Sequence, residues 1–95
     1  MTMSLALEAR IVCPPEVLSR VLDGEAVLLH LGSGTYFGMN EVATHAWERI
    51  TKGTTFGELL EATVAAFEVD EDAAQLDLEK LIDALVEKRL VTVEG

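Results

Sequence analysis

The hydrophobic pattern of this chain changes its period at Asn40. Before this residue, the segments "EVLSRVL" and "EAVLLHL" are rich in valine and leucine with strand-like spacing. After it, apolar side chains recur with the 3.6-residue period of helices. A chain that changes once from strands to helices is restricted to an α+β arrangement, and 95 residues leave room for one core only.

Three antiparallel strands are predicted before Asn40, over residues 16–22, 25–31 and 35–39. Asp23-Gly24 separates the first two strands and favours a tight hairpin, because both residues can adopt positive φ. The second strand carries apolar residues on both faces, which predicts a central position in the sheet. The third strand, "TYFGM", follows a Gly-Ser-Gly turn and is expected to lie at an edge.

Three helices are predicted after the strands, with N-caps at Asn40, Thr55 and Asp70. The first is expected to end at about Thr51. The second begins with a capping box formed by Thr55 and Glu58, and runs to about Phe67. The third is expected to carry Lys88 and Arg89 in its last turn, where cations interact favourably with the negative end of the helix dipole.

The two ends of the chain have weaker signals. Residues 1–15 alternate loosely and stop at Pro14-Pro15, which indicates either an N-terminal arm or an extra strand. Residues 16–95 are expected to form a single domain, and "VTV" near the end predicts a short closing strand.

The charge argues against several classes of partner. Seventeen acidic and seven basic residues give a net charge of −10, which repels nucleic acid and anionic membrane surfaces. The apolar residues are dispersed, so no membrane span is predicted. A single cysteine excludes an intramolecular disulfide, and the start of the chain lacks the features of a signal peptide. The expected compartment is the cytoplasm.

The sequence lacks the residue patterns of catalysis and metal binding. Cys13, His30 and His45 are the reactive side chains, and no pair of them has the local spacing of a metal site. The histidines fall on a predicted strand and a predicted helix, where a structural role is the simpler interpretation. We therefore expect no enzyme activity, no cofactor and no metal.

The edge strand is the candidate binding site. An edge exposes unpaired N–H and C=O groups, and one use of them is to capture an extended peptide. Tyr36 and Phe37 point to opposite faces, so one packs in the core and the other lines a groove, although the sequence leaves open which does which. Leu76 on the third helix could form the opposite wall, or it could pack under the N-terminal arm.

These motifs resemble the PqqD-like family, the RiPP recognition elements named after the pyrroloquinoline quinone biosynthesis chaperone. The shared pattern is Gly-Glu after the hairpin, then Gly-x-Tyr-Phe-x-x-Asn, a tryptophan seven residues further on, and a last helix with spaced apolar residues. In this chain these are Gly24-Glu25, residues 34–40, Trp47, and Asp77 with Ile82 and Leu85. Met39 replaces the family's usual leucine, which is a tolerated exchange.

The resemblance implies a winged helix-turn-helix-like domain, with a three-stranded antiparallel sheet followed by three helices and no catalytic activity. Such domains capture the leader segment of a ribosomally made precursor peptide by strand addition and present it to a maturation enzyme: a radical-SAM protein, a protease or a cyclase. The implied peptide-binding residues are Thr35, Tyr36, Phe37, Gly38, Met39, Leu76, Glu79, Lys80 and Asp83. The alternatives are a winged-helix DNA-binding regulator and a homodimerising interaction domain.

Overall fold

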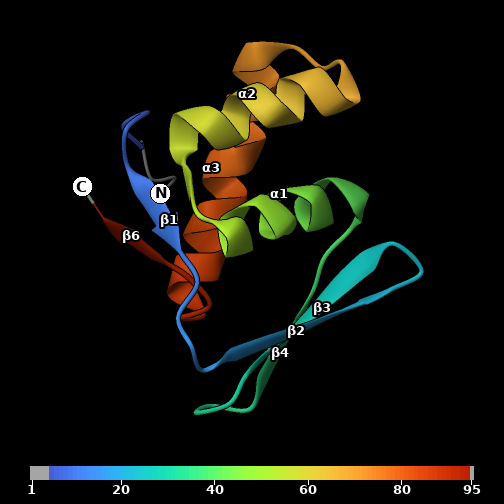
Figure 1. Cartoon of the computed structure of the whole chain (residues 1–95), viewed down its shortest axis with the longest axis vertical. Helices are drawn as coiled ribbons and strands as arrows, with labels where there is room; N and C mark the ends of the chain where they lie inside the picture. The colour runs from blue at the N-terminus through green and yellow to red at the C-terminus, as the bar shows by residue number, and fades with distance from the viewer. Residues whose placement is uncertain (1–4, 95) are drawn as a thin grey trace.

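A computed structural model describes residues 5–94 of the chain (Figure 1). This part of the sequence forms six strands and three helices. Their order is β1 (Arg10–Val12), β2 (Val17–Leu22), β3 (Glu25–His30), β4 (Thr35–Gly38), α1 (Glu41–Lys52), β5 (Thr54–Thr55), α2 (Phe56–Phe67), α3 (Glu71–Glu87) and β6 (Thr92–Glu94). The change from a sheet to helices at Asn40 is confirmed.

The larger sheet is antiparallel, with β3 between β2 and β4. The turn between β2 and β3 has φ values of 54° at Asp23 and 80° at Gly24. Two successive positive values define the hairpin turn that Asp-Gly favours. The predictions of a central second strand and an edge third strand are both confirmed.

A second sheet joins the two ends of the described chain. β1 lies between β5 and β6, and both pairs are antiparallel. Ala9 and Ile11 are buried, so this part of residues 1–15 forms an extra strand packed on the domain. Residues 1–4 lie outside the described part. The two-residue strand β5 was not predicted, because so short a segment has no periodicity to read.

The three N-caps lie where the sequence predicts them. The side chains of Asn40, Thr55 and Asp70 each accept a hydrogen bond from the amide three residues further on. In the capping box of α2, the Glu58 carboxylate also accepts the amide of Thr55. These local bonds satisfy helix amides that would otherwise lack partners, which is why each helix begins where it does.

The predicted end of the third helix was wrong. α3 ends at Glu87, so Lys88 and Arg89 lie beyond its last turn. Arg89 has φ of 60°, and its amide donates to the carbonyl of Val86 while Leu90 donates to Leu85. This pair of bonds reverses the chain and buries Leu90, and that burial outweighs the favourable charge of a longer helix.

Arg89→Gly is expected to stabilise the domain. Glycine adopts positive φ without the steric cost that arginine bears, so we expect a gain of about 0.5–1 kcal/mol in the free energy of unfolding. Chemical denaturation of the variant measures it. Arg49→Gly, a matched exchange inside α1, should instead lose roughly 1 kcal/mol. Equal losses in both variants would contradict the assignment of strain to Arg89.

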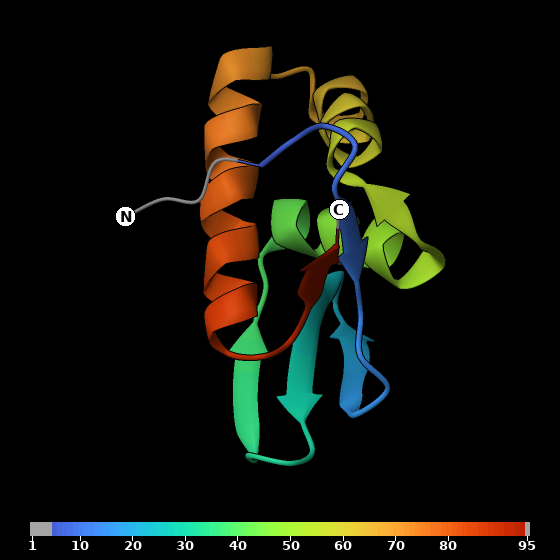
Figure 2. The same ribbon diagram turned by 90° about the vertical axis from the view of Figure 1, so that its left-hand side faces the viewer.

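The core lies between one face of the larger sheet and the three helices (Figure 2). Ala26 and Leu28 of β3 face inward, and Trp47 is fully buried as predicted. The other face of the sheet is covered by no element among the described residues. The domain therefore offers a strand edge and a bare sheet face at one end, and helices at the other.

The N-terminal segment is hydrogen-bonded to two helices. The amides of Phe56 and Gly57, in the first turn of α2, donate to the carbonyls of Ala9 and Leu7 at 2.8 Å each. The amide of Leu5 donates to Glu79 Oε2 on α3 at 3.0 Å. Residues 5–9 thus supply acceptors for helix amides that have none within the helix.

Candidate functional site

At the free edge of β4, two residues expose their backbone N–H and C=O groups. Within the described residues β4 pairs with β3 alone, and the amide of Met39 donates to the carbonyl of Ala26 at 2.8 Å. Antiparallel pairing alternates, so Phe37 also directs its backbone groups toward β3. Tyr36 and Gly38 therefore direct their N–H and C=O groups away from the sheet, where an added strand could bond to them.

A buried threonine fixes the end of this edge. The amide of Ala26 donates to Thr44 Oγ1 at 2.7 Å, and the same hydroxyl donates to the carbonyl of Met39 at 3.4 Å. Ala26 and Met39 thus share one direct backbone bond, and the Thr44 hydroxyl bridges the second pair of backbone groups between them. Thr44 thereby joins α1 to the sheet, and no local sequence pattern indicates this positioning role.

The register decides which aromatic side chain is exposed. Phe37 pairs with the fully buried Leu28 and is half-buried against the core. Tyr36 pairs with Leu29 on the opposite face, and its side chain is 69% exposed. The question that the sequence left open is therefore answered: Phe37 anchors the fold and Tyr36 is free for contact.

Tyr36 ends an apolar row on the bare face of the sheet. Leu18, Leu29 and Tyr36 lie side by side across the three strands. Leu22, Val27 and Leu31 share this face by alternation and are exposed. Exposed apolar patches of this kind mark binding surfaces in soluble proteins. A strand added to β4 would extend the row.

The remaining predicted site residues fall into two groups. Thr35 is half-buried and is held in the turn by Ser33, whereas Met39 is buried in the core. On α3, Lys80 is exposed, Asp83 is half-buried and Leu76 is 48% exposed, which disfavours the alternative that Leu76 packs under the arm. Glu79 is only 9% exposed and holds Leu5, so its carboxylate is already engaged.

A hollow of about 500 Å³ lies where the larger sheet, the end of α3 and β6 meet. Glu16, just before β2, and His30 of β3 line it on one side, and Val86 of α3 and Arg89 just beyond that helix line it on another. Its lining includes no residue of β4, so the hollow does not adjoin the free edge. The sequence could not reveal it, because the lining residues before β4 and those at the end of α3 lie more than 50 positions apart.

The reactive side chains have structural contacts. His30 Nδ1 lies 3.2 Å from both the amide and the hydroxyl of Ser33, within the turn before β4. The His45 ring packs edge-on against Phe67, with centroids 5.3 Å apart. Burial, and secondarily the charge of Glu16, raise the pKa of the Cys13 thiol, which disfavours a nucleophilic thiolate. No group of three metal-ligating side chains occurs within residues 5–94.

Together, the fold and the free edge define a winged helix-turn-helix-like α+β domain. The chain matches the family described as coenzyme PQQ synthesis protein D (PqqD) over residues 25–91, and it belongs to that family. The comparison with curated proteins gave no match. None of the helices in residues 5–94 is long and apolar enough to cross a membrane.

Two solved structures are similar to this chain. TbiB1, in complex with the TbiA(beta) leader peptide, is 35% identical, with a TM-score of 0.80 over 84% of this chain and 93% of that chain. A lasso peptide synthetase B1 complexed with its leader peptide is 24% identical, with a TM-score of 0.76 over 86% of this chain and 96% of that chain. The second likeness concerns the fold alone.

Proposed function

We propose that this chain captures the leader segment of a ribosomally made precursor peptide by strand addition to β4. The observation that carries the proposal is the pair of outward backbone groups at Tyr36 and Gly38, next to an exposed aromatic side chain. Support comes from membership of the PqqD family and from TbiB1, whose structure holds a leader peptide. The chain acts without catalysis and presents the peptide to a maturation enzyme.

The physical basis of capture is the balance between ordering and contact. A disordered leader loses chain entropy when it becomes a strand, so main-chain bonds alone give little net affinity. Side-chain contacts must supply the rest. Tyr36 offers a rigid aromatic surface on the bare face of the sheet. We expect alternate leader residues to contact this surface.

Tyr36→Asp is expected to weaken binding of the precursor peptide encoded beside the gene. Loss of one cross-strand aromatic contact and the added charge should reduce affinity roughly three- to tenfold. Leu18→Asp is the matched control, because Leu18 lies in the same cross-strand row on the opposite edge strand. Fluorescence anisotropy with labelled peptide measures both. An equal loss in the two variants would argue against binding at β4.

The alternatives have less support. A DNA-reading helix needs basic or amide side chains, whereas α2 carries Glu58 and Glu61 and no basic residue. Homodimerisation through β4 would use the same backbone groups as the peptide. Sizing chromatography distinguishes these uses, because a peptide that adds to β4 would dissociate a dimer formed there.

A further inference from the structure

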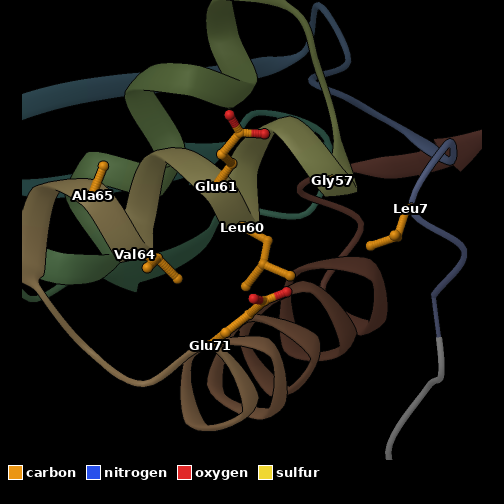
Figure 3. A pocket seen from close by; sticks show the side chains of 7 residues that line it. All are labelled: Leu7, Gly57, Leu60, Glu61, Val64, Ala65 and Glu71. Atoms are coloured by element: carbon orange, nitrogen blue, oxygen red, sulfur yellow. The ribbon is translucent and has the colours of Figure 1, made fainter.

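An apolar groove of about 490 Å³ lies at the end of the molecule away from β4 (Figure 3). Leu60 and Val64 of α2 form its floor, Leu7 faces them from the N-terminal segment, and Glu71 rises from the start of α3. Figures 1 and 2 both place α2 at the opposite end from the larger sheet. A ligand in the groove would therefore leave the β4 edge free.

The wall formed by Leu7 is held in place by its backbone. The Leu7 carbonyl accepts the amide of Gly57, and a Cβ at Gly57 would meet that oxygen at 3.1 Å. This close approach requires the small residue at the start of α2. It holds the Leu7 side chain, which is 54% exposed, at the mouth of the groove instead of in the core. An exposed leucine in a segment that backbone hydrogen bonds hold in place is suited to contact a partner.

The chain segment that contains α2 and the start of α3 carries one sign of charge. The sequence from Gly53 to Glu79 contains no lysine or arginine. It contains eight carboxylates, at Glu58, Glu61, Glu68, Asp70, Glu71, Asp72, Asp77 and Glu79. Glu61 and Glu71 line the groove itself and are exposed. On its other side Glu61 borders a second hollow, which Arg49 of α1 also lines. The apolar floor is therefore flanked by two exposed carboxylates, with one arginine near Glu61.

We propose that this groove binds a basic segment of a partner protein. One large apolar side chain of that segment inserts between Leu7, Leu60 and Val64, and lysine or arginine residues on either side pair with Glu61 and Glu71. Charge complementarity selects this occupant. A second copy of the chain is disfavoured because each copy carries a net charge of −10. The proposal does not depend on peptide capture at β4.

The test uses a fluorescein-labelled peptide in which one leucine stands between two pairs of lysines. Its twin carries serine in place of leucine. At about 0.15 M salt, which screens distant charges, we expect the leucine peptide to bind roughly tenfold more tightly than its twin. The double variant Glu61→Lys, Glu71→Lys should weaken binding of the leucine peptide by about tenfold or more.

The matched control has the same change in charge away from the groove. Glu48→Lys, Glu87→Lys replaces two exposed carboxylates on α1 and α3, and it should change affinity by about twofold or less. Circular dichroism checks that both double variants fold. An equal loss in the two variants, equal affinity of the two peptides, or no binding of the leucine peptide would each overturn the proposal.

A titration of ¹⁵N-labelled protein with the leucine peptide locates the contact. Shifts are expected at Leu7, Leu60 and Glu71, and shifts concentrated at residues 35–39 would overturn the proposal. The two functions remain separable. The groove variant should retain binding of the precursor peptide, whereas blocking the edge of β4 should leave binding of the leucine peptide unchanged.

Discussion

Gly38→Pro is expected to abolish most of the peptide binding while the domain stays folded. Proline removes the outward N–H of Gly38 and places its ring where the added strand must approach. A Cβ at Gly38 meets nothing within 4 Å, and an edge strand tolerates proline when the lost N–H faces outward. Loss of one hydrogen bond with an unsatisfied partner should weaken binding roughly ten- to hundredfold.

The other edge of the same sheet supplies the control. By the same alternation, the amide of Ser19 on β2 faces away from β3, and Ser19 is exposed. Ser19→Pro therefore makes the same change at the opposite edge. It should leave affinity for the precursor peptide unchanged in the same anisotropy titration. If Ser19→Pro abolishes binding and Gly38→Pro does not, the peptide adds to β2.

Thr44→Val is expected to destabilise the domain more than other single exchanges of similar size. Valine preserves the shape but leaves the buried amide of Ala26 and the carbonyl of Met39 without the hydroxyl. The expected cost is about 2–3 kcal/mol of unfolding free energy. For a domain of this size the melting temperature should fall by roughly 10–20 °C. Thermal denaturation followed by circular dichroism measures it.

Thr51→Val is the matched control on the same helix. Its hydroxyl donates to the carbonyl of Glu48 on an exposed surface, where water can replace it. The expected change is within about 0.5 kcal/mol. Equal effects of the two exchanges would mean that Thr44 contributes nothing through its buried bonds, and that the junction of α1 with β4 is held by other contacts.

The parts of the fold that the sequence predicted depend on local interactions. Asp23-Gly24 determines its turn through the backbone freedom of two adjacent residues. Asn40 and Thr55 determine helix starts through bonds that span three residues. Such signals act between neighbours in the chain, so one sequence is enough to read them. The central and edge positions of the strands followed from the apolar pattern of each strand.

Strands near both ends of the chain were predicted, residues 1–15 as an arm or an extra strand and residues 91–93 as a closing strand, but their pairing in one sheet was missed. β1 pairs with strands that begin more than 40 residues later, and each of the three strands has two or three residues. Glu79 was among the implied peptide-binding residues, but its carboxylate accepts the amide of Leu5, which is 74 residues away. No local pattern marks such a partner.

The candidate site was predicted in outline only. Its location on β4 followed from the edge position. The roles of Tyr36 and Phe37 depend on the register of β4 against β3, in which Phe37 pairs with the buried Leu28. Met39 was assigned to the site and lies in the core. The bonds of Thr44 to two strands could not be read from the sequence, because a threonine in a helix usually carries no such meaning.

Amide hydrogen exchange measures whether the bound peptide pairs with β4. In the free protein, the amides of Tyr36 and Gly38 should exchange rapidly, whereas that of Phe37 is already protected by pairing with β3. Addition of the precursor peptide should slow exchange at Tyr36 and Gly38 at least about tenfold, with little change at Phe37. Protection that appears instead along β2, or no new protection at Tyr36 and Gly38 with the peptide bound, would contradict capture by strand addition to β4.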